Sequence, residues 1–299
     1  MGFLKFIQFQ MPEMMKPYGI FHIISLIVMV TLAILLCVFA RKIQEKNLNK
    51  FLMITWIVLV ALEVYKQFVF SYGFDSDGNI HWHYSWYAFP YQFCATALTF
   101  LPFIFWNKAS NKVSTFIREG CIAFACTFNF FAGVAVMLAP GDVFTTYNAG
   151  ICVHTMIHHG MQMVLGVYLF VYYRKQLKLT SYLKALPIFG FFLINAMLLN
   201  IIVPKINGGE TFNMFFISPY FDCTLPVLCD IYPKVPYIVF LMIYVVGFAI
   251  AGFLIYNIIY WINFLVDYLI KKIRVVDYLD EKREEEQTTK ETPSLEAEE

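Results

Sequence analysis

One cysteine and three histidines lie inside apolar stretches of this sequence, where reactive side chains are rare. Cys94 follows Phe-Pro-Tyr-Gln-Phe, and His154, His158 and His159 lie close together further along the chain. A thiol and a histidine at matching depth could carry out covalent acyl transfer, because the histidine removes the proton that keeps the thiol unreactive. Without such a base, a cysteine in apolar surroundings is inert and acts only as a small packing residue.

The spacing of the histidines leaves the choice of base open. His154 and His158 are four residues apart and share a helix face, whereas His159 is turned by about 100° from His158. His159 and His158 are therefore both candidate catalytic residues beside Cys94. Histidines that only make packing hydrogen bonds are the structural alternative.

The same spacing is found in zinc sites, since a His-x-x-x-His pair on a helix can hold a metal. No carboxylate lies beside His154 and His158 in the sequence, so a third ligand would have to come from His22, His81 or His83. We therefore expect no metal and no cofactor, and a zinc-dependent lipid hydrolase is only the third hypothesis.

Other polar side chains fall at a similar level. Counted from the outer ends of their predicted helices, Glu63 and Cys94 both lie roughly 12 Å deep. Intramembrane polar groups are costly, so their concentration in one half of the membrane predicts a polar cavity in the outer leaflet. The residues expected to bind substrate or support the site are Gln92, Asn129, Glu63, His154, Asn200 and Asn213. Gln92 or Asn129 is the expected oxyanion donor, and Glu63 is expected to pair with Lys66 three residues later.

The composition indicates that much of the surface of this chain is surrounded by membrane lipid. Of its 299 residues, 60% are hydrophobic and 14% are charged, against about 45–50% and about 25% in soluble domains. The net charge of +1 gives no indication of a nucleic-acid partner. A multi-pass protein of the cell membrane is expected.

Seven apolar stretches are each long enough to cross a bilayer. They cover residues 18–40, 51–72, 85–106, 113–138, 149–173, 182–204 and 236–263. Lys and Arg gather in the connections 41–50, 107–112 and 174–181, while the intervening connections 73–84 and 139–148 have none. The positive-inside rule then predicts an all-α, seven-transmembrane-helix bundle with its N-terminus outside and its C-terminus in the cytoplasm.

This topology divides the chain into an extracellular segment at 1–17, a transmembrane domain at 18–270 and a cytoplasmic tail at 271–299. The acidic tail is predicted to be disordered. The connection 205–235 is apolar and rich in Gly and Pro, so we expect a partly re-entrant cap over the outer mouth of the bundle. Cys223 and Cys229 lie in it, either as a disulfide or as two free thiols.

Three segments resemble the YwaF-like bacterial integral membrane proteins and their eukaryotic relative, transmembrane protein 164. They are Phe89-Pro90-Tyr91-Gln92-Phe93-Cys94-Ala95, His159-Gly160 with Gly166-Val167-Tyr168-Leu169, and Asn213-Met214-Phe215 with Pro219. Ala95 stands where the family has a small hydroxyl residue, and Gly166 where it has proline. The resemblance implies a seven-helix bundle that transfers phospholipid acyl groups, with Cys94 as nucleophile and His159, or the adjacent His158, as base.

Three functions follow as hypotheses. The first is a membrane-embedded lipid acyltransferase or hydrolase that uses Cys94 and His159, with a membrane lipid as its substrate partner. The second is a non-enzymatic seven-helix transporter or sensor that binds a small ligand in the same cavity, although the inner halves of the predicted helices offer few polar groups for a transport pathway. The third is the zinc-dependent hydrolase.

Overall fold

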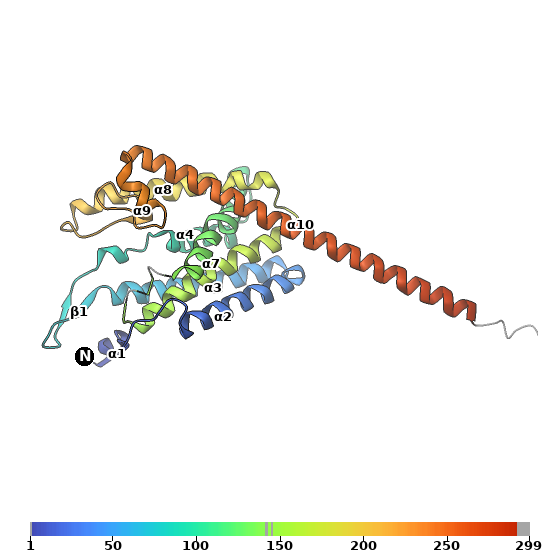
Figure 1. The fold of residues 1–299 in the computed structure, drawn as a ribbon, viewed down its shortest axis with the longest axis horizontal. Coiled ribbons are helices and arrows are strands. Elements are labelled where there is room, and N and C mark those ends of the chain that lie inside the picture. The colour runs from blue at the N-terminus through green and yellow to red at the C-terminus, as the bar shows by residue number, and fades with distance from the viewer. Residues whose placement is uncertain (1, 141–142, 145, 292–299) are drawn as a thin grey trace, which may run out of the picture. The chain divides into compact units, whose positions relative to one another are not determined.

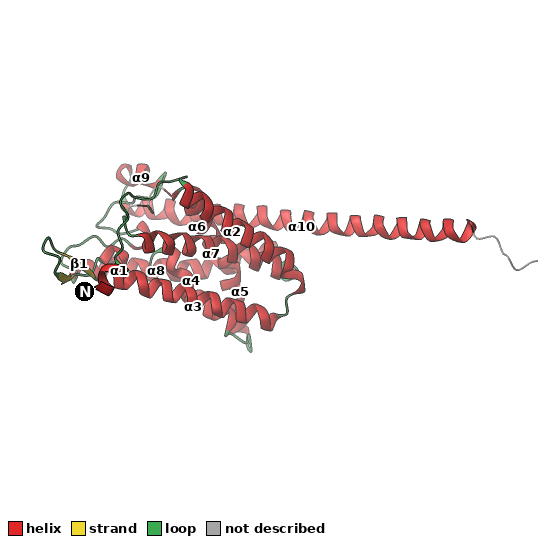
Figure 2. Ribbon diagram, turned by 90° about the horizontal axis from the view of Figure 1, so that it is seen from below, coloured by secondary structure: helices red, strands yellow, loops and turns green. Residues whose placement is uncertain are grey.

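Helices make up most of the described structure, a computed structural model that covers residues 2–140, 143–144 and 146–291 (Figure 2). The side chains of Arg41 and of residues 274–291 are not described. The chain forms two compact units, Met1–Tyr256 and Asn257–Glu299. The predominantly helical class predicted from the sequence is confirmed.

The helices follow one another along the chain from blue to red (Figure 1). They are α1 (Gly2–Ile7), α2 (Ile20–Phe39), α3 (Glu45–Val69), α4 (Thr96–Phe105), α5 (Lys112–Phe124), α6 (Phe130–Leu138), α7 (Ala149–Tyr173), α8 (Ala185–Ile202), α9 (Leu228–Ile231) and α10 (Tyr237–Glu291). Short 3₁₀ turns precede α4 and α8, and a π-helical turn joins α5 to α6.

Five helical stretches of the described chain are long and apolar enough to cross a membrane. They are Ile20–Phe39, Glu45–Val69, Lys112–Leu138, Leu179–Lys205 and Tyr237–Ile273. The helix Phe93–Phe105 is apolar but shorter, and α7 has 25 residues and carries the three histidines. The chain is therefore a membrane protein, while seven crossings and their orientation stay predictions.

The third predicted crossing differs from the expected helix over 85–106. Its first part consists of a 3₁₀ turn at Trp86–Ala88 and an extended stretch, and the helix starts only with a 3₁₀ turn at Phe93–Ala95. Pro90 explains the break, because proline donates no backbone hydrogen bond and keeps the preceding residue out of the helical conformation. Cys94 therefore lies in the first turn of its helix and not in the middle of one.

The buried helix α7 is the centre of the first unit. It packs against α2, α3 and α6, and its N-terminal half also contacts the turn that holds Cys94. Close approach to α6 depends on Gly133, where an added Cβ would lie 2.6 Å from both the carbonyl oxygen of His159 and the backbone nitrogen of Met163. Small residues at helix contacts are a common means of packing in membranes.

The connection 73–84 contains most of a short β-hairpin. Its strands β1 (Tyr72–Phe74) and β2 (Ile80–Trp82) pair in antiparallel register, with Gly73 opposite His81. The turn between them is closed by Asp75, whose carboxylate accepts the backbone N–H groups of Asp77 at 3.0 Å and Asn79 at 2.8 Å. These hydrogen bonds to the charged form hold the pKa of Asp75 below its usual value.

The connection 205–235 carries a deeply buried segment. Phe212, Met214, Phe215 and Ile217 are inaccessible to solvent, as expected if protein covers this loop, although its re-entrant position stays a prediction. Phe215 has a φ of 57°, an uncommon conformation for a bulky residue that the surrounding contacts must maintain. In the same connection, Cys223 is buried, Cys229 is exposed and both are free thiols.

The backbone of the C-terminal tail, predicted to be disordered over 271–299, is helical as far as it is described. Helix α10 continues to Glu291, so most of the segment expected to be disordered is helical, whereas 292–299 lie outside the described residues. Glu, Lys, Arg and Gln dominate this stretch, and these residues have high helix propensity. The low hydrophobicity of the tail indicated disorder, but low hydrophobicity does not prevent an existing helix from continuing.

Replacement of Gly133 by alanine should destabilise the protein by about 1–3 kcal/mol, since the new methyl group meets backbone atoms that cannot rotate away. The thermal unfolding midpoint of the detergent-solubilised protein measures this. Gly190→Ala in α8 is the control, because its Cβ would meet no atom within 4 Å. An equal loss in both variants would contradict the close approach of α6 and α7.

Candidate active site

The thiol of Cys94 lies where a helix begins, at the turn Phe93–Ala95. The free N–H groups of a helix N-terminus carry partial positive charge, which favours an anion such as a thiolate. The backbone of this turn is attached to α7, because the side-chain amide of Gln162 donates to the Cys94 carbonyl oxygen at 2.9 Å. Cys94 is half-buried, so it is in contact with α7 but keeps some solvent-accessible surface.

The buried side-chain amides of Gln162 and Asn129 support the turn that holds Cys94. Gln162 also donates to the Asn129 side-chain oxygen at 2.9 Å, so one amide joins the Cys94 turn to α6. Asn129 ends the π-helical turn Ala125–Asn129 and is completely buried. Such turns often mark functional sites, since they redirect one side chain inside a helix. The Gln162 side-chain oxygen is buried without a hydrogen-bond partner among the described residues.

His159 is held in one tautomer by its own helix. Its Nδ1 lies 2.8 Å from the carbonyl oxygen of Thr155, and a carbonyl can only accept, so Nδ1 carries the proton. In the neutral ring, Nε2 then has the free lone pair that a general base needs. His159 is one helical turn from Gln162, the residue that binds the Cys94 turn.

His158 and His154 point instead towards α3. The Nε2 of His158 lies 3.1 Å from the Leu59 carbonyl oxygen, and that of His154 lies 3.3 Å from the Glu63 carboxylate. Their rings are stacked with centroids 4.3 Å apart. This engagement with α3 leaves His159 as the better candidate base for Cys94. The Nδ1 of His154 is buried and lacks a partner among the described residues.

Glu63 is the centre of a buried charged network. Its carboxylate pairs with the Lys66 ammonium at 2.8 Å, which confirms the predicted ion pair, and accepts the Gln67 amide at 2.7 Å. Gln67 in turn accepts the Tyr84 hydroxyl at 2.5 Å. Burial and the charge of Glu63 raise the pKa of Tyr84 to about 12, so this hydroxyl remains a donor at neutral pH.

The fold brings a carboxylate to the histidine pair, although none lies beside it in the sequence. Glu63, His154 and His158 place one ligand atom each within 4.8 Å of one another. The histidines expected to complete a metal set lie in other environments. His22 accepts from the Tyr18 backbone and donates to Met137, and His83 pairs with Glu210 at 3.2 Å.

Three predicted supporting residues hold the buried loop segment. Gln92 donates to the Asn213 carbonyl at 2.8 Å and accepts the Phe215 N–H at 3.0 Å. Asn200 bonds both backbone groups of Met214. Asn213 accepts the N–H of Ser218 at 2.8 Å. The loop therefore engages both the oxygen and one N–H of the Gln92 amide, and the second N–H of its NH2 group is the one that could donate to an oxyanion.

Asn129 is the other predicted oxyanion donor. Its amide nitrogen makes only one long contact, at 3.5 Å, to the carbonyl oxygen of Gln162. Gln162 itself was not predicted from the sequence, nor were Thr155, Gln67 and Tyr84. An amide one helical turn after His159 in an apolar helix was the available signal for Gln162, whereas Thr155 and Tyr84 gave none.

Comparison with known proteins matches residues 17–260 to the TMEM164 family. No curated protein and no solved structure matches the chain significantly. The matched range includes every residue of the candidate site.

Replacement of Glu63 by glutamine should cost about 3–5 kcal/mol of stability, because it leaves a buried ammonium without a counter-charge. The side chains of Lys66 and Glu63 are only 14% and 7% exposed. Adding Lys66→Met should recover much of the loss. Denaturant titration of the detergent-solubilised protein measures both variants.

The matched control is Glu119→Gln, which breaks the more exposed ion pair with Lys184 and should cost less than about 1 kcal/mol. If Glu63→Gln is as mild as this control, the buried pair does not stabilise the fold.

Proposed function

Because this chain belongs to the TMEM164 family, we propose that it is a membrane-embedded lipid acyltransferase or acyl hydrolase that works through Cys94 and His159. The observation that carries the proposal is the local setting of the two residues. Cys94 lies at a helix N-terminus, and the Thr155 carbonyl leaves the lone pair of His159 on Nε2. The two segments are joined through Gln162.

In the first half-reaction, Nε2 of His159 takes the thiol proton and the Cys94 sulfur attacks the acyl carbonyl of a phospholipid. The ester C–O bond breaks, and the lysolipid oxygen leaves with the proton from His159. A thioester on Cys94 remains. In the second half, His159 takes a proton from an acceptor hydroxyl or from water, whose oxygen attacks the thioester. The C–S bond breaks, the acyl group leaves as a new ester or acid, and the thiolate recovers its proton.

The tetrahedral intermediate needs a donor for its oxyanion. Asn129 fits this role, since its amide nitrogen is weakly engaged while Gln162 fixes its oxygen at 2.9 Å. A preorganised donor of this kind contributes about 10²–10³-fold to rate.

We further propose a membrane topology of seven crossings and a relationship to the YwaF-like bacterial proteins. The shorter helix Phe93–Phe105 and the histidine-bearing α7 would complete seven crossings, with the basic connections in the cytoplasm and the candidate site near the outer face. The likeness of the motifs around Cys94 and His159 to YwaF-like bacterial proteins supports a multi-pass protein of the cell membrane. The predicted outer-leaflet cavity would admit the lipid ester.

The arrangement around Glu63 favours a second candidate, a metal-dependent lipid hydrolase. The 3.3 Å between Glu63 and His154 is long for a charge-assisted hydrogen bond, which is usually about 2.7–2.9 Å. It is close to the ligand-to-ligand separation of about 3.4 Å expected around tetrahedral zinc. The ammonium of Lys66 on the same carboxylate opposes a cation there, so this candidate ranks second.

Metal analysis of the purified protein separates the two candidates. The acyl-transfer proposal predicts no stoichiometric zinc and no loss of activity with a chelator. Zinc close to one per chain, lost together in His154→Ala and His158→Ala, would favour the hydrolase instead.

The central test of the leading proposal is turnover of a fluorescent phospholipid by protein in liposomes. Cys94→Ala should abolish turnover, and His159→Ala should reduce it by about 10²–10⁴-fold. Cys37→Ala is the matched control, since Cys37 is also half-buried in an apolar helix, and it should retain full activity. Undiminished turnover in Cys94→Ala, with correct folding, would leave the non-enzymatic binding or transport function as the better explanation.

A further inference from the structure

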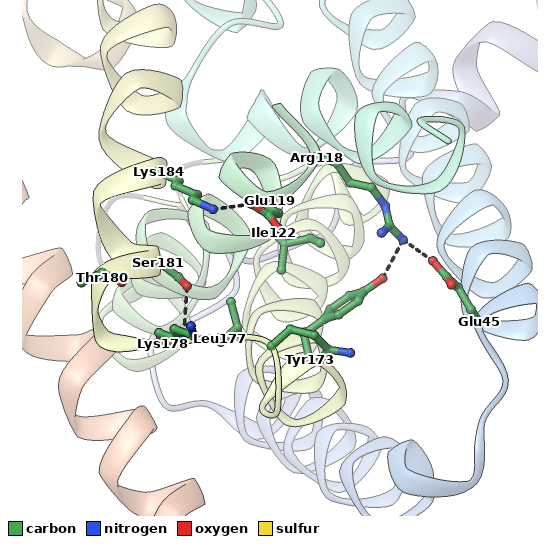
Figure 3. Close-up of a pocket in the computed structure, with 11 residues that line it drawn as sticks. Glu45, Arg118, Glu119, Ile122, Tyr173, Leu177, Lys178, Thr180, Ser181 and Lys184 are labelled. Atoms are coloured by element: carbon green, nitrogen blue, oxygen red, sulfur yellow. Dashed lines mark hydrogen bonds and ion pairs between the residues drawn. The ribbon is translucent and has the colours of Figure 1, made fainter. Parts of the chain in front are cut away.

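A polar cavity of about 500 Å³ lies far from the candidate active site, at the end of the bundle where the basic connections gather. Glu45 marks this end of α3, about 27 Å along the helix from Glu63. The cavity walls come from the start of α3, the second half of α5, the end of α7 and the connection that follows it, including the 3₁₀ turn Leu179–Lys184 (Figure 3). Its size is within the range of about 300–1,000 Å³ found for ligand pockets.

The acidic side chains of this cavity are already neutralised. Arg118 pairs with Glu45 at 2.5 Å, and Lys184 pairs with Glu119 (Figure 3). Lys178 also lines the cavity, and no described residue provides an acidic partner for its ammonium. The lining therefore has one uncompensated positive charge.

Its hydroxyl groups are oriented as donors. The Tyr173 oxygen accepts from Arg118 at 3.0 Å, and the Ser181 oxygen accepts the Lys178 N–H at 3.0 Å. Each hydroxyl therefore keeps its own proton for another acceptor. Arg118 is held rigidly, since its Nε also donates to the Ile104 carbonyl at 3.1 Å.

We propose that this cavity binds a phosphate group, with Lys178 as its counter-charge and Tyr173 and Ser181 as hydrogen-bond donors. The Lys178 ammonium and the two hydroxyl groups can donate charge-assisted hydrogen bonds to the negatively charged oxygens of a phosphate group. Basic pockets between transmembrane helices bind lipid head groups in this way, and a soluble phosphate compound offers the same group. The site does not depend on the proposed acyl transfer.

Native mass spectrometry of the full-length protein in detergent tests this site by titration with phosphatidylglycerol. Lys178→Gln should weaken binding by about tenfold, while Lys175→Gln should leave it unchanged. Lys175 is exposed on the same connection but is not part of the lining, so it controls for general surface charge. Equal effects of the two substitutions would overturn the proposal.

Two further ligands identify what is recognised. Diacylglycerol with the same acyl chains should bind much more weakly, and equal binding would show that phosphate is not recognised, against the proposal. Inorganic phosphate identifies the source. If it displaces the lipid in a Lys178-dependent way, the site serves soluble phosphates as well, and if it does not, the site is specific for a lipid head group.

Discussion

The buried ion pair between Glu63 and Lys66 is the interaction on which the rest of the site depends. A single charge at this depth would be very costly, so neither residue is tolerable without the other. The pair also organises its surroundings. Glu63 fixes His154 and Gln67. A structural charge pair thereby creates a polar region inside an apolar bundle, beside the helix that carries the three histidines.

Helix α7 places its three histidines in different surroundings within this polar region. His154 and His158 face α3 and its charges, whereas His159 is held by its own helix and lies one turn from the amide that contacts the Cys94 turn. Close contact of α6 at Gly133 fixes the backbone of α7 at His159. Helix packing, and not the local sequence, therefore assigns different chemistry to three identical side chains.

Much of this fold was predictable, because crossing helices require long apolar stretches that leave a strong signal in the sequence. The ion pair three residues apart was predictable for the same local reason. The approach of Glu63 to His154 was not, since 91 positions separate them and only tertiary packing brings them together. The place of Cys94 at a helix start was missed because Pro90 was read as part of a continuous helix. The hairpin at Tyr72–Trp82 was missed because its strands have only three residues each.

Trapping of the acyl group on Cys94 is the most direct test of the proposed mechanism. The protein would be incubated with a phospholipid, quenched in acid and digested, and its peptides would be analysed by mass spectrometry. An acyl adduct is expected on the peptide that contains Cys94, released by neutral hydroxylamine as a thioester should be, and lost in Cys94→Ala. Lipid turnover that continues in Cys94→Ala, with no adduct on the wild-type peptide, would show that Cys94 does not carry the acyl group.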